Sequence, residues 1–202
     1  MKILFVNACM RGENSRTLML CRELLKELTD SLPGAEIVEH DLRTMGLKSV
    51  DQAVLDVKEP LCDALAWDHQ LFAPVLDFRS ADAVVIGAPY WDMSFPSVLK
   101  VWVENMYVRN LTFRYVNDQP VGLCEGRESA YITTAGSPIG ENDWGAGYMR
   151  AVLNTLGIPG FTRVSAEALD LQSSDCDAIM RAAMDDVRRE ARAMAQRLRD
   201  GR

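Results

Sequence analysis

The sequence has little positive charge and no paired cysteines. Its 22 lysines and arginines are outnumbered by 29 acidic residues, which gives a net charge of −7. Because nucleic acids and anionic membranes attract basic surfaces, this balance argues against a protein that binds either, and it favours a small-molecule partner. The five cysteines show no CxxC spacing, so neither a disulfide framework nor a metal site of the zinc type is indicated. We therefore expect a reducing, cytoplasmic setting.

Long apolar runs and flexible linkers are also missing. No stretch reaches the roughly 20 apolar residues that a membrane-spanning helix needs. The first apolar run begins at Lys2, without a charged leader before it. No tract rich in Pro, Gly and Ser divides the 202 residues, which suffice for one well-buried domain. The expectation is a soluble, unexported protein with a single domain over residues 1–202.

Short apolar runs of strand length alternate with segments of helical periodicity. The predicted strands and helices follow one another along the whole chain: strands at 2–7, 35–42, 81–89, 128–136 and 161–171, and helices at 15–31, 68–80, 96–108, 145–156 and 174–199. The runs VVIGA and AYITTA show little alternation of apolar and polar residues, which is typical of strands covered on both faces. The pattern predicts an α/β fold with a doubly wound, five-stranded parallel sheet and helices on both faces. Residues 43–67 have no clean period and are interpreted as an insertion after the second strand.

Ligands of such sheets bind outside the carboxyl ends of the strands, so the loops after the strands carry the functional signal. The first loop runs from Cys9 to Asn14 and continues into Ser15, Arg16 and Thr17 at the start of a helix. Free backbone amides at a helix N-terminus, two hydroxyls and either Arg11 or Arg16 together suit a phosphate. Asn and Ser are also common helix caps where no ligand is bound, so Asn14 and Ser15 alone do not establish a phosphate site.

Two further loops follow buried strands. The second, APYWDMSFP at 88–96, places two neighbouring aromatic side chains where a flat ring could stack, although they could also pack under a loop or at a subunit interface. The third, TTAGSPIG at 133–140, is small enough for its backbone to approach the edge of a planar ligand, although many turns are rich in Gly and Ser. Three such loops on one sheet edge predict a site for a mononucleotide with a flat head group.

A known family shares these residues. The stretch APYWDMSFPSVLKVWVENMYVRNLTFRYVNDQPVGL resembles the second flavin loop, the following helix and the hairpin of the FMN-dependent NAD(P)H:quinone oxidoreductases and azoreductases, which have a flavodoxin-like fold. The Ser15-Arg16-Thr17 loop, the ITTAG loop and the segment GYMRAVLNTLGI are also similar to that family. The resemblance covers most of the chain and spares about residues 43–67.

The resemblance implies a set of FMN-binding residues. The phosphate would be surrounded by Cys9, Ser15, Arg16 and Thr17, the isoalloxazine lined by Pro89, Tyr90, Trp91, Asp92 and Met93, and its other edge met by Thr134, Ala135, Gly136 and Ser137. Two positions depart from the family: Cys9 stands where Ser is common, and a thiol is the weaker donor. Asp92 stands where Asn is common, and we expect its carboxylate to reach the flavin N3–H or to point away.

The resemblance also implies an activity. FMN would take a hydride from NADH or NADPH at its N5 atom and pass it to a quinone, an azo compound or a similar small acceptor, with no acid or base demanded of the side chains. Family members complete the pocket with a second subunit, so a homodimer is expected. Phe113, Tyr115 and Trp102 are candidates for pocket walls or a dimer interface, and Trp102 is equally well explained as a core aromatic.

Two alternative functions belong to other classes of protein. The chain could be a flavodoxin-like electron carrier or flavin-binding regulatory module, which would show no turnover of its own. It could instead resemble low-molecular-weight tyrosine phosphatases, which place a Cys and an Arg after the first strand. Their spacing is C-x5-R with a later Asp-Pro pair, whereas Cys9 to Arg16 is C-x6-R and the sequence has no Asp-Pro pair.

Overall fold

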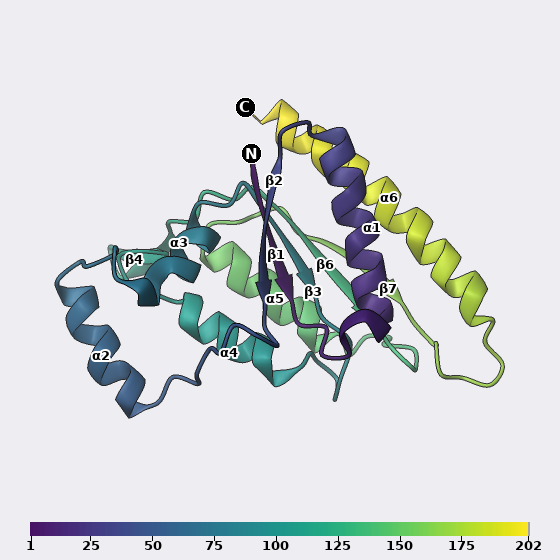
Figure 1. Ribbon diagram of the computed structural model, residues 1–202, viewed down its shortest axis with the longest axis horizontal. Helices are drawn as coiled ribbons and strands as arrows, with labels where there is room; N and C mark the ends of the chain where they lie inside the picture. Colours follow the sequence, from purple (N-terminus) through teal and green to yellow (C-terminus); the bar gives the residue numbers. More distant parts are fainter. Residues whose placement is uncertain (202) are drawn as a thin grey trace.

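The computed structural model describes residues 1–201. Its centre is a parallel sheet of the five predicted strands, β1 (Lys2–Asn7), β2 (Glu36–Asp41), β3 (Ala83–Gly87), β6 (Glu128–Thr134) and β7 (Thr162–Ala166), in the order β2-β1-β3-β6-β7 (Figure 1). The predicted five-stranded parallel sheet is confirmed. Because β1 pairs with both β2 and β3, the strand order reverses at β1, which is where sheets of this type bind ligands.

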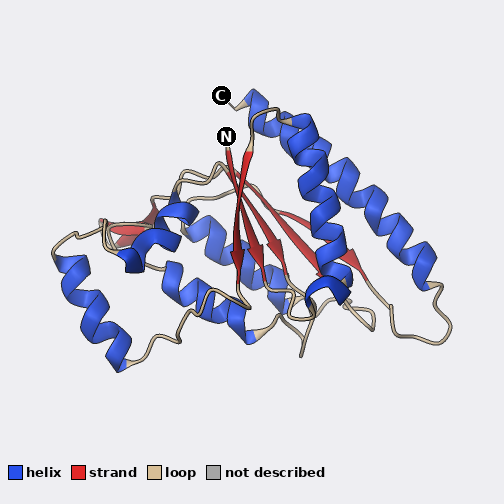
Figure 2. Cartoon of the chain, in the orientation of Figure 1, coloured by secondary structure: helices blue, strands red, loops and turns tan. Residues whose placement is uncertain are grey.

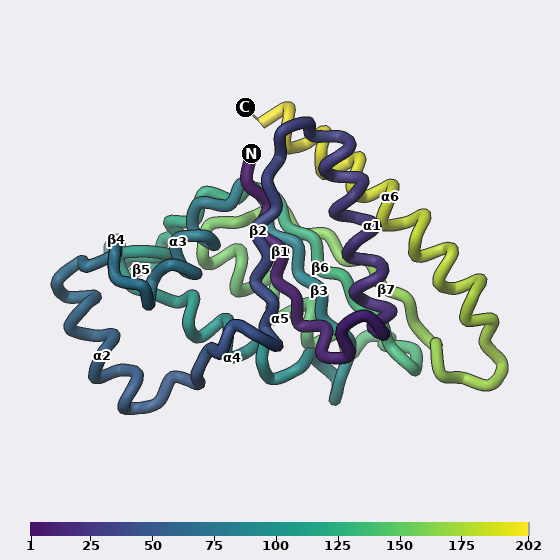
Figure 3. Tube along the Cα trace, viewed as in Figure 1, coloured from purple at the N-terminus to yellow at the C-terminus, as the bar shows by residue number. Residues whose placement is uncertain are grey.

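Helices cover both faces of the sheet, as predicted (Figure 2). On one face lie α1 (Arg16–Ser31) and α6 (Cys176–Asp200), which pack side by side (Figure 3). On the other lie α3 (Ala73–Arg79), α4 (Ser97–Met106) and α5 (Trp144–Thr155). Every residue of β3 is buried, which explains why its sequence shows no alternation.

Trp102 of α4 belongs to the core and not to a pocket wall. Its side chain is fully buried, and its ring meets that of Phe78 edge-on with centroids 5.1 Å apart. The indole Nε1–H donates to Nδ1 of His40 at 3.1 Å, so the one polar atom of the ring is satisfied inside the core.

The segment 43–67 contains a helix that the sequence pattern did not predict, α2 (Gln52–Asp63). It begins at Asp51, whose side chain accepts a hydrogen bond from the Val54 N–H at 2.9 Å. Lys58 is its one buried residue, and Nζ of Lys58 donates to the carbonyl oxygens of Asn105 and Tyr107 at 3.4 and 3.5 Å, just at and beyond the end of α4. The half-buried residues Val54, Leu55, Leu61 and Cys62 form a helical stripe, but Lys58 stands in the middle of it and Pro60 lies within the helix, so the pattern is easily missed in the sequence.

Two smaller departures complete the fold. The helix predicted at 68–80 is divided into a 3-10 turn, η2 (Gln70–Phe72), and α3. Beyond α4, β4 (Phe113–Val116) and β5 (Gln119–Gly122) form a separate antiparallel hairpin, joined by Asn117 and Asp118, both with positive φ. Among residues 1–201 no helix combines the length and the apolar character required to cross a membrane.

Candidate functional site

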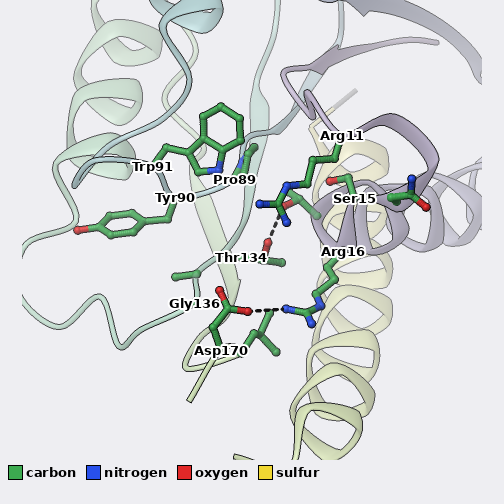
Figure 4. A pocket seen from close by; sticks show the side chains of 13 residues that line it. Arg11, Ser15, Arg16, Pro89, Tyr90, Trp91, Thr134, Gly136 and Asp170 are labelled. Carbon is green, nitrogen blue, oxygen red and sulfur yellow. Dashed lines mark hydrogen bonds and ion pairs between the residues drawn. The ribbon is translucent and has the colours of Figure 1, made fainter. Parts of the chain in front are cut away.

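The loops after β1, β3 and β6 meet at one edge of the sheet and enclose a cavity of about 410 Å³ (Figure 4). The loop after β7 closes a further side. The cavity is lined by Arg11, Asn14, Ser15, Arg16, Thr17, Pro89, Tyr90, Trp91, Thr134, Ala135, Gly136, Leu169 and Asp170. The three loops singled out in the sequence therefore contribute to one cavity.

One end of the cavity is the N-terminus of α1. A short 3-10 turn, η1 (Gly12–Asn14), leads into the helix, and Ser15, not Asn14, is its cap: the Ser15 hydroxyl accepts from the Leu18 N–H at 3.2 Å. The N–H groups of Arg16 and Thr17 have no acceptor within the helix, because the residues four positions earlier precede it. These amides and the helix dipole make this end suitable for an anion.

Two arginines line the cavity, and they differ in their partners. Arg16 forms an ion pair with Asp170, its Nη1 lying 3.1 Å from Oδ1. Arg11 has no ion-pair partner among residues 1–201, and its side chain extends over the cavity (Figure 4). The sequence left open which arginine would balance a bound anion, and the geometry favours Arg11 as the free cation.

The wall opposite α1 is aromatic. Pro89, Tyr90 and Trp91 follow β3, and the Tyr90 hydroxyl donates to the carbonyl oxygen of Asn142 at 3.1 Å. Trp91 and Ser94 exchange backbone hydrogen bonds of 3.1 and 2.8 Å around a tight turn.

The tip of that turn is formed by Asp92 and Met93. Both adopt left-handed φ values, 50° and 66°, which are strained for residues other than glycine, and both are exposed. Neither lines the cavity. A contact of either residue with a flavin stays a prediction.

The third loop is held against the segment after β7. The Ala135 carbonyl accepts from the Leu169 N–H at 3.1 Å, and the Gly136 carbonyl from the Asp170 N–H at 2.9 Å. A Cβ atom on Gly136 would lie 2.3 Å from Oδ2 of Asp170. The absence of a side chain at residue 136 leaves room for the Asp170 carboxylate in this position, a role of the glycine that the sequence did not reveal.

Cys9 lies beneath the first loop and does not line the cavity. Its side chain is fully buried, with Sγ 3.6 Å from the Gly87 carbonyl oxygen. Hydrogen bonds from the Cys21 thiol, and then from Ser15, lower the pKa of Cys9, whereas burial raises the pKa of Cys21. A thiol held in this way inside the protein supports the loop from below and is inaccessible to a substrate.

Most of the expected site residues line this one cavity. Those that do not are Cys9, Asp92, Met93 and Ser137. The sequence reasoning missed Leu169 and Asp170, because the fifth strand was predicted to run to residue 171, whereas β7 ends at Ala166. The rule that ligands bind beyond strand ends would have found both residues had the end of the strand been recognised.

The strand order and a nucleotide-sized cavity at the carboxyl edge define an α/β protein of the flavodoxin type. In agreement, the sequence profile of a family described as flavodoxin-like fold matches residues 1–191. Among solved structures, an FMN-dependent NADH-azoreductase from Bacillus anthracis (strain Ames Ancestor), solved in complex with FMN, superposes with a TM-score of 0.85 over 96% of this chain and 99% of its own, at 22% identity.

Comparison with sequence relatives identifies a narrower family than the fold alone. The FMN-dependent NADH:quinone oxidoreductase 1 of Pseudomonas putida is 33% identical over 84% of this chain and 87% of its own length. The FMN-dependent NADH:quinone oxidoreductase 2 of Clostridium acetobutylicum is 29% identical over 95% and 98%. The chain belongs to the flavodoxin-like fold family and, within it, to the family of these FMN-dependent NADH:quinone oxidoreductases.

Proposed function

We propose that this chain is an FMN-dependent NAD(P)H oxidoreductase that reduces quinones, azo compounds or similar small electron acceptors. The observation that carries the proposal is the cavity itself, with anion-binding groups at one end and an aromatic wall at the other. The names of the relatives, which describe FMN-dependent NADH:quinone oxidoreductases, support the same activity.

The residues present fit the phosphate of FMN. A phosphate monoester carries close to two negative charges at neutral pH and accepts several hydrogen bonds. The amides of Arg16 and Thr17 are donors of the required kind, and the Arg11 guanidinium, which has no ion-pair partner among residues 1–201, is a cation. These residues and Ser15 line one end of the cavity. Cys9 would act on this phosphate only through the loop that it supports.

The ring system would lie at the other end. Pro89, Tyr90 and Trp91 supply a rigid apolar wall, and Thr134, Ala135 and Gly136 supply backbone and hydroxyl groups opposite it. When bound, FMN supplies hydride transfer between a nicotinamide and an acceptor. The chain binds and orients the cofactor, and its aromatic wall keeps water from one side; no side chain has to move a proton.

We further propose that the chain forms a single domain and works as a homodimer in the cytoplasm, with no nucleic-acid or membrane partner. The hairpin β4–β5 exposes apolar surface, with Tyr115 63% and Val121 40% exposed, and a second copy could cover it. Phe113 and Tyr115 do not line the cavity of the single chain, so a role in a substrate pocket would need that second copy. Light scattering after gel filtration measures the mass directly, and a monomer at micromolar concentration would contradict the dimer.

The phosphatase alternative has no support in the geometry. Cys9 is buried and outside the cavity, and Arg16 pairs with Asp170. A nucleophilic thiol must reach its substrate, and this one does not.

The test of the proposed function has two stages. The purified protein should bind FMN, and the absorption of the bound flavin should bleach when NADH or NADPH is added without oxygen. With menadione or an azo dye present, NADH oxidation should continue over many turnovers. Bleaching without turnover would indicate the electron carrier or regulatory module, and a protein that takes up no FMN would refute the oxidoreductase.

A further inference from the structure

An acidic side chain stands inside a cavity that is otherwise suited to an anion. Asp170, from the segment between β7 and α6, reaches Arg16 at the start of α1 and forms an ion pair at 3.1 Å (Figure 4). The two residues are 154 positions apart in the sequence, and both line the cavity. The pair therefore joins two different walls of the site.

The backbone of Asp170 is held against the third loop. Its N–H donates to the Gly136 carbonyl at 2.9 Å, and its carboxylate occupies space that any side chain at residue 136 would fill. Ala168, two residues earlier, adopts a left-handed φ of 61°, which turns the chain towards the cavity. The exposed fractions of the two side chains, 46% for Arg16 and 73% for Asp170, mean that the pair contributes little to stability. A role in folding does not explain it.

The Arg16 side of the pair belongs to the phosphate end of the cavity, and its Asp170 side lies against Gly136 of the third loop. Arg16 supplies one of the free amides at the N-terminus of α1, and the same residue carries the bridge to Asp170. Tyr90 and Trp91 lie across the cavity from Arg16 (Figure 4). A phosphate held by the α1 amides would therefore have the Arg16–Asp170 bridge as its neighbour.

We propose that Asp170, acting with Arg16, is a specificity-determining residue that restricts the site to a flavin ending in a single phosphate. This inference rests on the proposed function. FMN ends at its phosphate and needs no room beyond the α1 amides. In FAD that phosphate is esterified to a second nucleotide, so the chain of atoms must continue past the bridge, and the second anionic phosphate approaches the Asp170 carboxylate. The bridge obstructs the path, and the carboxylate repels the added charge.

Isothermal titration of the apoprotein with FMN, FAD and riboflavin tests this directly and needs no turnover. Asp170→Asn removes the charge and keeps the volume, whereas Asp170→Ala also opens the path. We expect the wild-type protein to bind FMN much more tightly than FAD. The ratio of FAD to FMN affinity should rise about fivefold or more in Asp170→Asn and further in Asp170→Ala. Riboflavin, which has no phosphate, should bind all variants alike.

The matched control is Glu141→Gln. Glu141 is exposed on the neighbouring loop and does not line the cavity, so its variant changes the net charge by the same amount without touching the bridge. Its FAD to FMN ratio should equal that of the wild type.

Two results would overturn the proposal. An unchanged ratio with weaker FMN binding in both Asp170 variants would mean that Asp170 only orients Arg16 on the phosphate. Equal ratios in Asp170→Asn and Glu141→Gln, with no further rise in Asp170→Ala, would reduce the effect to net charge. Failure of the wild type to bind any flavin would instead refute the proposed function itself.

Discussion

The Thr17 hydroxyl at the start of α1 lies 2.7 Å from the Thr134 hydroxyl at the end of β6. Thr17 is fully buried, and both residues line the cavity. Only one of the two hydroxyl protons can lie between the oxygens, so the other hydroxyl keeps its proton free to donate elsewhere. The contact therefore ties the proposed phosphate loop to the central sheet and leaves one donor available.

Breaking this pair on one side should destabilise the protein. Thr134→Val leaves the buried Thr17 hydroxyl without its partner and should lower the free energy of unfolding by about 1–2 kcal/mol. The double variant Thr17→Val/Thr134→Val removes both polar groups and should recover much of that loss. Urea denaturation of the apoproteins measures both effects. Losses that simply add would show that the two hydroxyls do not interact.

Removing the charge of Arg11 should weaken the binding of FMN but not of riboflavin. The Arg11 guanidinium is the cation without an ion-pair partner among residues 1–201, so Arg11→Gln should raise the Kd for FMN about tenfold or more. Titrations at low and high salt provide a second readout, since added salt should weaken FMN binding less in the variant than in the wild type.

A matched control is Arg114→Gln, which removes the same charge from an exposed position on β4. It should bind FMN as the wild type does. If both variants lost affinity equally, the effect of Arg11 would reflect the net charge of the protein rather than a contact.

The central sheet could be predicted because burial on both faces demands apolar runs. β3 and β6 show this plainly, and their limits differ from the prediction only at the ends. The helix α2 was missed because its stripe of half-buried apolar residues is interrupted by the charged Lys58, and Pro60 lies inside the helix. A charged residue in the apolar stripe and a proline inside a helix hide a periodicity that is present.

The candidate site was also predicted from the sequence only in part. Ser15, Tyr90 and Gly136 could be placed on one sheet edge from the sequence, because the topology alone brings strand ends together. The partner of Arg16 could not be predicted, because its ion pair with Asp170 depends on a left-handed residue at Ala168 and on the space above Gly136. Long-range contacts between exposed side chains leave no local pattern in the sequence.

Arg163 should affect cofactor binding although it does not line the cavity. Its guanidinium contacts the carboxylates of Asp143 and Glu167, the latter at 2.8 Å. Glu167 in turn accepts a hydrogen bond from the Ile139 N–H at 2.8 Å. These contacts anchor the loop before α5 to β7.

That loop also holds the aromatic wall, because the Tyr90 hydroxyl donates to the Asn142 carbonyl. Arg163→Met should therefore raise the Kd for FMN several-fold, and Arg163→Lys, which keeps the charge, should restore part of the affinity. Titration calorimetry gives the affinities, and thermal unfolding of the apoproteins gives the stability. A lowered melting temperature with unchanged FMN affinity would assign Arg163 a purely structural role.

Acid should destabilise the protein through His40. Burial lowers the pKa of His40, and the nearby Asp77 carboxylate opposes this only in part. Nδ1 of His40 accepts the Trp102 indole N–H at 3.1 Å, which requires that nitrogen to be unprotonated. The folded protein thus keeps His40 neutral at a pH where the unfolded chain has begun to take up a proton.

The direction of the pH effect on stability follows from the linkage between proton binding and unfolding. Below the ordinary histidine pKa of about 6.5 the unfolded chain binds a proton that the folded protein refuses, so stability falls as the pH falls. The loss continues until the lowered pKa of the folded state is reached, with a slope of at most about 1.4 kcal/mol per pH unit. Urea midpoints between pH 7 and about pH 5 should show this decline in the wild type. In His40→Gln, whose side-chain oxygen can still accept from Trp102, the curve should be flatter over the same range, and parallel curves would mean that other groups cause the decline.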